Sequence, residues 1–385
     1  MKESIKIRNL GPIKDLEIEI KPITFFIGAS ASGKSTILKA VALFRYLFKM
    51  LCIRSYLRDA NIIRSPFRIR MESLLKNCGF DSMVNPDTYI EYTAVREDRK
   101  YTLRFQSRKL TYEPKIVDRN DLAFFKVSYI SENRNIIPTW ASRIAANKGA
   151  SLGFYFHETF NDFNDATDAV KEFDIDLWNV KLSVRKADLG KKYLIAPTDK
   201  AYNPIELRRA SSGIQSSIPL SVIANYFATE FSFKDAFRRS VLNYLYENDN
   251  LTDFKPNVEL TDLDKYVHMH IEEPEISADP NTQVRLIDSL IKQCFIDRND
   301  DRTLTIMVAT HSPYIINELN VLIKASYYEK EVAIRSDQIA VYKVVEGRLE
   351  NLIVLDNDTR QVVVNALDMS ETMDNIYQRY IALGK

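Results

Sequence analysis

The sequence predicts an α/β fold organised around one strand, loop and helix near the N-terminus. Residues 23–27 form a short run of β-branched and aromatic residues, and residues 37–44 are apolar at helical spacing. Between them, residues 28–35 read G-x-x-x-x-G-K-S, with every fixed position filled. In the last third of the chain, apolar strand patterns again alternate with helical ones, which is typical of α/β domains.

The residue types of this loop fit the binding of phosphate. Gly28 and Gly33 permit backbone angles that a side chain would oppose, so the N–H groups of the loop can turn towards phosphate oxygens. A helix that begins near Lys34 adds free N–H groups and the positive end of its dipole. Lys34 is expected to reach the β- and γ-phosphates, and Ser35 to offer its hydroxyl to Mg²⁺. We therefore predict that the chain binds a nucleoside triphosphate. The predicted contacts come from Gly28, Ala29, Ser30, Ala31, Ser32, Gly33, Lys34, Ser35 and Thr36.

Composition limits the number of domains, the cellular compartment and the kinds of partner. The 385 residues are enough for one large α/β domain with insertions or for two domains, and 45% hydrophobic with 27% charged residues is ordinary for a soluble protein. No apolar run approaches the roughly 18 residues of a membrane span, and no signal-peptide core is present. Three scattered cysteines favour a reducing cytoplasm. The net charge of +1 means that any nucleic-acid surface must be a local patch.

The other elements are predicted from local periodicity. The first part of the chain predicts strands at 5–8, 16–20 and 127–130, a long helix over 37–60 and an antiparallel region over 88–112. Residues 141–177 have a mainly helical pattern, followed by strand candidates at 178–184 and 192–195. The last third predicts strands at 267–271 and 304–309, helices at 281–295 and 313–322, a hairpin of 338–345 with 349–355, and helices within 361–383.

Two acidic residues follow the strand at 267–271. Ligands of α/β sheets bind at the carboxyl ends of strands, which is where Glu272 and Glu273 are expected. Two glutamates after a strand are more often a solvated turn, but the Pro-Glu-Ile-Ser-Ala-Asp-Pro stretch that follows favours a site. We assign Glu272 to Mg²⁺, and Glu273 to the orientation or deprotonation of an attacking water.

Two further stretches carry candidate site residues. His311 follows the apolar strand at 304–309, so its imidazole can reach a γ-phosphate from the edge of the sheet, although a lone histidine is more often structural. Residues 210–216 precede an apolar helical run, and a Ser-Gly pair at a helix start can bind an anion. An ordinary N-cap is the simpler interpretation of that stretch taken alone.

Together these stretches resemble the ABC-type ATPases of the non-transporter branch, which includes the SMC and RecF proteins and the overcoming-lysogenization-defect (OLD) nucleases. The motifs occur in the family's order. The matching stretches are 28–36 for the Walker A loop, 211–215 for the signature, 272–275 for Walker B, 277–279 for the D-loop and 310–312 for the switch histidine. Ile214 stands where the signature more often has glycine. The resemblance implies a P-loop ATPase head whose core sheet is flanked by helices, with an antiparallel β subdomain in its N-terminal part and a helical insertion.

The resemblance also implies domain boundaries and residue roles. Residues 1–385 would form a single ABC-type ATPase domain, with a first lobe over 1–130, a mostly helical or irregular insertion over 131–210 and a second lobe over 211–385. Catalysis by Lys34, Glu273 and His311 and Mg²⁺ binding by Ser35 and Glu272 follow from the matched motifs. Further nucleotide contacts are implied for Ser212, Gly213, Gln215 and Asp279. Residues 129–134 are similar to a Tyr-Ile-x-x-x-Arg stretch of OLD-like ATPases, and Gln106 and Glu132 are both candidates for the Q-loop residue.

The family's mechanism implies a homodimer. Two heads pack head to tail with ATP between them, so that the Walker A loop of one chain faces Ser212 and Gly213 of the other. Nucleotide binding and dimerisation are then thermodynamically linked. Hydrolysis removes the shared phosphate contacts and loosens the pair.

The sequence leaves the purpose of the ATPase open among three classes. OLD nucleases carry a C-terminal TOPRIM domain, but the short spacing between Glu346 and Asp356 favours a solvated hairpin here. The chain is most similar to stand-alone ATPase subunits of phage-defence systems of the Septu, retron-associated and PARIS types, in which a separate nuclease or toxin acts. A DNA-binding repair ATPase is the alternative, with basic clusters at Arg54, Arg58, Arg64, Arg68 and Arg70, and at Lys186, Lys191 and Lys192. The third class is a sensor that binds ATP and scarcely hydrolyses it.

Overall fold

A six-stranded sheet forms the centre of the molecule. The computed structural model describes residues 1–62, 69–141, 152–187, 190–199, 201–242, 245–246, 254–328, 334–366 and 371–382. In spatial order the strands are β15 (Arg348–Asn351), β14 (Ile339–Val345), β3 (Ile23–Ile27), β13 (Thr303–Thr310), β12 (Asp264–Glu272) and β7 (Ala123–Ile130). All neighbours pair in parallel except β15, which pairs antiparallel with β14. The carboxyl ends of β3, β13, β12 and β7 therefore meet at one edge, as expected for an α/β fold.

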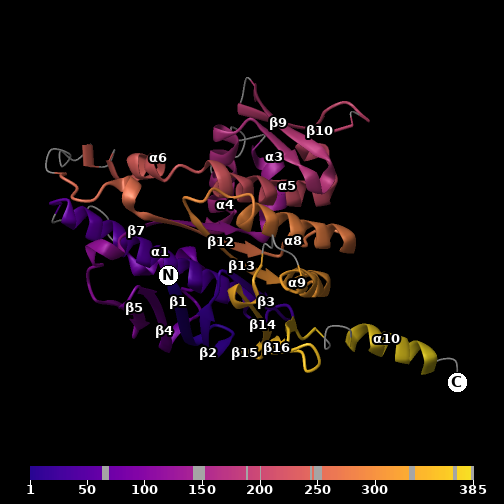
Figure 1. Cartoon of the computed structure of the whole chain (residues 1–385), viewed down its shortest axis with the longest axis horizontal. Helices are drawn as coiled ribbons and strands as arrows, with labels where there is room; N and C mark the ends of the chain where they lie inside the picture. Colours follow the sequence, from indigo (N-terminus) through magenta and orange to yellow (C-terminus); the bar gives the residue numbers. More distant parts are fainter. Residues whose placement is uncertain are drawn as a thin grey trace.

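A second, antiparallel sheet lies on the other side of α1 (Lys34–Asp59) (Figure 1). Its strands in spatial order are β2 (Ile13–Ile20), β1 (Lys2–Leu10), β4 (Val84–Arg96), β5 (Arg99–Gln106) and β6 (Lys109–Glu113). The predicted N-terminal strands and antiparallel region are confirmed. Phe48 of α1 packs its ring against Tyr101 of β5 and Phe125 of β7, so this helix buries side chains against both sheets.

Residues 131–210 contain more strand than their sequence pattern indicates. The helices α3 (Ile137–Ala141) and α4 (Phe154–Ala169) precede a four-stranded antiparallel sheet, and residues 142–151 lie outside the described part of the chain. The strands are β8 (Glu172–Ile175), β9 (Val180–Ala187), β10 (Gly190–Pro197) and β11 (Ile205–Glu206). The expected helical pattern is wrong at β8, because a four-residue alternation is too short to recognise without its partner β9.

In the second half of the chain, four helices lie where helical patterns were predicted. Those within the described ranges are α5 (Ser212–Asn225), α8 (Pro280–Phe295), α9 (Pro313–Ala325) and α10 (Glu371–Ala382), whereas α6 (Phe233–Phe237) and, in the first half, α2 (Met71–Asn77) were not predicted. Residues 362–364 were expected in a helix, but they form β17 (Val362–Val364), which pairs with β16 (Ile353–Leu355). Figure 1 shows α10 at the C-terminal end, away from the rest of the chain. Within the described ranges, no helix has both the length and the apolar character needed to cross a bilayer.

A buried charged cluster joins the two sheets through α1. Arg45 of α1 forms two hydrogen bonds of 2.9 and 2.8 Å with the carboxylate of Glu3, which also accepts a bond from Tyr92. Arg45 lies 3.3 Å from Nε2 of His270, whose Nδ1 lies 3.0 Å from the Ser128 carbonyl oxygen. Because a carbonyl only accepts, Nδ1 carries the proton and Nε2 accepts from Arg45. His270 is therefore neutral and part of the core, and burial together with Arg45 lowers its pKa to about 3.

Candidate active site

The phosphate loop is held tightly from both sides. Gly28 has a φ of 156°, and a Cβ there would lie 2.6 Å from the Val344 carbonyl oxygen of β14. Gly33 has a φ of 110°, and its Cβ would lie 2.5 Å from Cδ1 of Ile13 in β2. A side chain at Gly28 would press on the backbone of β14, and one at Gly33 would need an unfavourable positive φ and would displace the Ile13 side chain, which explains why this loop needs both glycines.

Lys34 lies inside the curve of this loop. Its Nζ donates to the carbonyl oxygens of Gly28 and Ala29, at 2.8 and 2.9 Å. Burial lowers the pKa of Lys34, while the nearby carboxylates of Glu273 and Glu275 act to raise it. The lysine is thus fixed at the loop, within electrostatic reach of the acidic residues that follow β12.

The N-terminus of α1 is left available to a ligand. Its N-cap residue is Gly33, and no side chain caps the helix. Ala29, Ser30 and Ala31 are exposed, whereas Ser35 is partly exposed and Thr36 is buried. Free N–H groups at the start of a 26-residue helix, directly after an exposed loop, form an arrangement suited to phosphate oxygens.

Glu272 ends β12 as a buried carboxylate that is poorly neutralised. Its Oε2 has no hydrogen-bond partner within the described ranges, and Lys39 of α1 approaches Oε1 only to 3.9 Å. Burial, and then the neighbouring Glu132 carboxyl, raises the pKa of Glu272 to about 7. Ser35 precedes Lys39 by one helical turn, so its hydroxyl lies on the same face of α1. The hydroxyl and the unpartnered carboxylate are hard oxygen donors, and they fit a Mg²⁺ ion, whose charge would offset the cost of burying Glu272.

Glu273 and His311 face each other in a more open position. Nε2 of His311 lies 3.5 Å from Oε1 of Glu273, and both side chains are about a third exposed, at 33% and 38%. The Glu273 amide donates to the Ala309 carbonyl oxygen at 2.8 Å, and the His311 amide donates to Oε1 of Glu275 at 2.5 Å. These bonds tie the ends of β12 and β13 together, so a carboxylate and an imidazole are presented side by side beyond the carboxyl edge of the sheet.

The signature-like residues lie at the start of α5. Ser211 is its N-cap residue and makes no side-chain cap hydrogen bond, Ser212 is exposed, and the Cβ of a side chain at Gly213 would lie 2.8 Å from the Ser277 carbonyl oxygen. Within the described ranges, no hydrogen bond or ion pair joins these residues to the phosphate loop. The candidate residues therefore form two groups, one at the sheet edge and one at the start of α5.

Two of the predicted contact residues serve their own loops in this protomer. The Gln215 amide group donates to the carbonyl oxygens of Ala210 and Arg208, at 2.7 and 3.3 Å. Asp279 caps α8 and accepts from the amides of Asn281 and Thr282, at 3.0 and 3.2 Å. Their immediate role is thus to shape the turns on which Ser212 and the start of α8 lie.

Sequence patterns missed a residue at the centre of the site. Arg134 lies in the short helix η2 (Glu132–Ile136) after β7, is completely buried and donates to four main-chain carbonyl groups. The similarity of residues 129–134 to OLD-like ATPases implies no role for this arginine. The same short helix brings Glu132 next to Glu272, whereas Gln106 lies at the end of β5 in the antiparallel sheet. Of the two Q-loop candidates, Glu132 is therefore the one that lies beside Glu272.

Several weaker sequence candidates lie outside the site. Glu346 is in the turn between β14 and β15, and the carboxylate of Asp356 accepts from the amides of Asp358 and Thr359, so both are turn residues as predicted. Arg64 and Arg68 lie outside the described residues.

Comparisons with known proteins agree with an ATPase domain around the phosphate loop. Residues 1–49 match the family model described as an AAA ATPase domain, and no curated protein matches the sequence. The structure is similar to an SMC head bound to the C-winged helix domain of ScpA, with a TM-score of 0.45, 10% identity and coverage of 91% of this chain and 96% of that chain. It is also similar to the SMC head domain from Thermotoga maritima (TM-score 0.40, 12% identity, 92% and 98% coverage). A third similar structure is the recombination mediator RecF with ATP (TM-score 0.39, 12% identity, 91% and 99% coverage).

Proposed function

We propose that the chain is a cytoplasmic ABC-type ATPase that hydrolyses ATP to ADP and phosphate. The observation that carries this proposal is the convergence of Lys34, Glu273 and His311 from the ends of three adjacent strands, with Glu273 and His311 3.5 Å apart. The phosphate loop and Lys34 hold the β- and γ-phosphates, and the Glu273 carboxylate accepts a proton from the attacking water. His311 lies beside that carboxylate. Its imidazole donates a hydrogen bond to a γ-phosphate oxygen, or stabilises the negative charge that develops there.

Ser35 and Glu272 are the residues that would hold Mg²⁺. When bound, the ion supplies positive charge to the phosphate oxygens. In this chain, Glu272 is held by its burial at the end of β12, and Lys39 supplies a compensating charge 3.9 Å away. In this proposal the Ser35 hydroxyl and the Glu272 carboxylate are the two side-chain ligands of the ion.

We also propose that two copies form a head-to-tail dimer around ATP. Ser212 is exposed at the start of α5, where its hydroxyl is accessible to a second chain. In the proposed dimer it contacts the nucleotide of the partner, together with Gly213 and the turns built by Gln215 and Asp279. A dimer of this kind makes ATP part of the interface, so ATP binding strengthens assembly.

The test is Glu273→Gln, which keeps the shape of the side chain and removes its basicity. Turnover should fall by about 10²–10⁴-fold, the usual contribution of a general base, while ATP binding persists. Light scattering with size separation should then show an ATP-dependent dimer, and Ser212→Arg should abolish it. Glu17→Gln, an exposed carboxylate of β2, is the matched control. Full turnover in E273Q would contradict the role of Glu273 as the base, and a wild type that scarcely hydrolyses ATP would leave only an ATP sensor. Concentration-independent turnover unaffected by S212R would contradict the dimer.

The biological role we propose is the gating of a separate nuclease or toxin subunit in antiviral defence. The resemblance of the motifs to stand-alone defence ATPases supports this role. The protein encoded by the adjacent gene should be tested for nuclease or toxin activity with the wild type and with E273Q, with and without ATP. Activity that follows the ATP state supports gating, and activity indifferent to nucleotide and to this chain contradicts it.

The hairpin of β9 and β10 favours a second candidate, a DNA-binding ATPase. Its register places Lys191 opposite Lys186 and Lys192 opposite Arg185. Within the part of the chain that the structure describes, Lys191 is the one of these four with an ion pair, to Asp168 at 2.9 Å. Like charges across a sheet are unfavourable, which suggests a phosphate-binding surface. Lys186→Glu with Lys192→Glu should abolish salt-sensitive DNA binding, whereas Lys234→Glu on α6 should not. Unchanged DNA binding in the double variant would exclude this hairpin as the DNA-binding surface.

A further inference from the structure

Arg134 connects three segments that are far apart in the sequence. Its Nε donates to the Ser216 carbonyl oxygen of α5 at 3.0 Å. Its Nη1 donates to the Glu272 carbonyl oxygen at 2.7 Å, and its Nη2 to the Glu273 carbonyl oxygen at 2.7 Å. A further bond of 3.3 Å from Nη1 reaches the Ser131 carbonyl oxygen at the end of β7. One guanidinium thus fixes the start of α5 relative to the end of β12.

The segment that Arg134 contacts has a strained backbone. Glu273 has a φ of 43° and Ser277 a φ of 59°, both in the left-handed region that non-glycine residues rarely adopt. The Ser216 hydroxyl donates to the Ile276 carbonyl oxygen at 2.7 Å, and Gly213 packs against Ser277. Such a conformation persists only where the surroundings over-determine it, and here the surroundings are Arg134 and α5.

Charge explains why the residue is arginine. Burial lowers its pKa to about 10, while the carboxylates of Glu275, Glu273, Glu132 and Glu272 act to raise it. The group therefore stays protonated at neutral pH. Its planar fork reaches carbonyl groups in several directions, which the compact ammonium of a lysine cannot do at once.

We propose that Arg134 is a positioning residue that couples the two ATP sites of the dimer. Within one protomer it holds Glu273, which acts on that protomer's own ATP, and the base of α5, whose Ser212 would contact the ATP of the partner. A change at either segment is transmitted to the other through a single rigid group. This inference rests on the proposed function and adds a path between its two sites.

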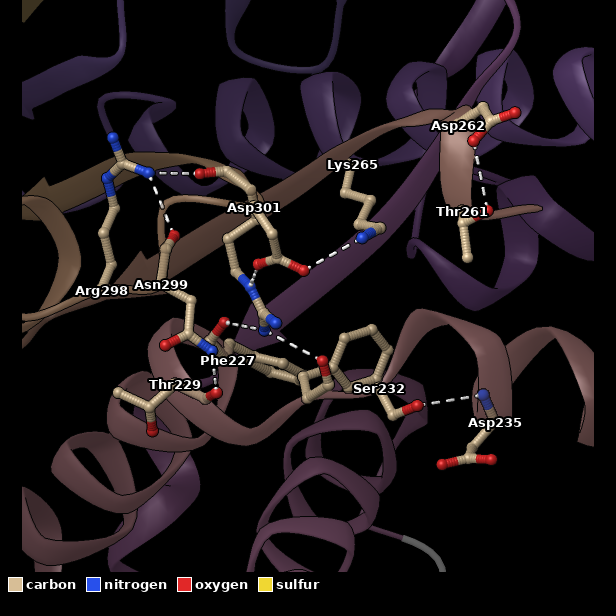
Figure 2. Close-up of polar contacts among 12 residues, drawn as sticks. Phe227, Thr229, Ser232, Asp235, Thr261, Asp262, Lys265, Arg298, Asn299 and Asp301 are labelled. Carbon is tan, nitrogen blue, oxygen red and sulfur yellow. Dashed lines mark hydrogen bonds and ion pairs between the residues drawn. The ribbon is translucent and has the colours of Figure 1, made fainter. Parts of the chain in front are cut away.

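The molecule offers a matched control at the opposite end of the same strands. Arg302 precedes β13 and is also buried, at 6% exposure, and it donates to the carbonyl oxygens of Phe231 and Phe227 at 2.9 and 3.2 Å. Figure 2 shows this region, where Asp301 pairs with Lys265 at 3.0 Å. A buried arginine with a purely structural role should therefore behave like Arg302.

The first experiment compares Arg134→Met with Arg302→Met. Both keep an apolar stem and remove the hydrogen bonds, so both should lower the unfolding temperature. For R134M, kcat per folded protein should fall at least about tenfold, because a misplaced catalytic group is costly. The KM for ATP should change by less than about threefold, because the phosphate loop is intact. R302M should keep both constants. R134K is the variant to use if R134M fails to fold, and it should regain stability without regaining kcat.

The second experiment measures the effect across the dimer. A wild-type protomer is mixed with excess E273Q partner, so that only the wild-type Glu273 can act, and single-turnover phosphate release is followed. Adding R134M to the E273Q partner should slow release at the wild-type site severalfold, because the partner's α5 is displaced. Adding R302M to the E273Q partner should not.

The outcomes separate this inference from the proposed function. Equal release with the E273Q and the E273Q/R134M partners, or equal loss with R302M, would overturn the coupling while leaving the ATPase dimer intact. Release by the wild type that is independent of any partner would instead contradict the dimer itself.

Discussion

Two buried glutamates, Glu3 and Glu272, lie on either side of α1 and have opposite electrostatics. They are 5% and 3% exposed, so burial raises the pKa of both. Glu3 nevertheless has a pKa lowered to about 2, because Arg45 and Tyr92 bind its carboxylate. Glu272 has a pKa raised to about 7, because Glu132 lies beside it and Lys39 remains 3.9 Å away. Equal burial therefore does not imply an equal role.

The difference shows that one buried acid stabilises the fold while the other is available to a ligand. The carboxylate of Glu3 has its partners within the protein, so it joins β1, α1 and β12 and has nothing left to offer a ligand. The carboxylate of Glu272 keeps an unpartnered oxygen at the carboxyl edge of the sheet. A buried acid without a full set of partners is costly, and a bound cation would remove the cost. The comparison predicts that neutralising the two residues has different consequences.

The largest effect is expected for Glu3→Gln. The substitution leaves Arg45 buried without its counter-charge, so the unfolding free energy should fall by about 3–5 kcal/mol. Urea unfolding at pH 7 measures this loss. Glu17→Gln is the control, because its ion pair with Lys6 is exposed and should be worth less than about 1 kcal/mol. A loss for E3Q as small as that of E17Q would mean that the Glu3–Arg45 pair is not the structural link described here.

Glu272→Gln should act on turnover and not on folding. Loss of the carboxylate from the metal position should slow phosphate release at least about 10²-fold, since metal contacts contribute several kcal/mol to such reactions. Without nucleotide, the unfolding free energy should stay the same or rise by up to about 1 kcal/mol, because a buried charge that Lys39 compensates only in part is removed. Steady-state phosphate release and urea unfolding of the same sample give both values. A variant as destabilised as E3Q with normal turnover would reverse the roles assigned to the two acids.

The sequence predicted the parts of the site that are made of neighbouring residues. The phosphate loop, α1 and the end of β12 are continuous stretches, so local periodicity and residue type were enough to mark Lys34, Glu272 and Glu273 as candidates. The structure adds that Glu273 and His311 lie together, which the parallel pairing of β12 and β13 brings about.

Contacts between distant positions could not be predicted in this way. Arg134 and Glu272 are 138 residues apart, and Glu3 and Arg45 are 42 apart, so no local pattern marks either pair. An arginine after a strand resembles many surface arginines until the carbonyl groups around it are known. The strand β8 was missed for the same reason, because its partner strand and not its own sequence makes it a strand.

The smallest of the three expected effects is the change of unfolding free energy with pH, which tests the comparison of Glu3 with Glu272 by acid titration. The pKa of His270 falls from 6.5 to about 3 on folding, so the unfolded chain binds more protons in this range and stability is lost as pH falls below 6.5. Glu3 adds a second loss from pH 4.5 towards 2. Glu272 acts in the opposite direction between pH 4.5 and 7, because its folded pKa is raised, so the test uses the E272Q background. Burial also lowers the pKa of His268, which therefore acts in the same direction as His270, and the contribution of His270 is the difference between E272Q and E272Q/H270Q. Between pH 6.5 and 4.5, E272Q should lose roughly 2 kcal/mol more unfolding free energy than the double variant, measured by urea unfolding at constant m-value. Equal losses in the two variants would place the titrating group elsewhere.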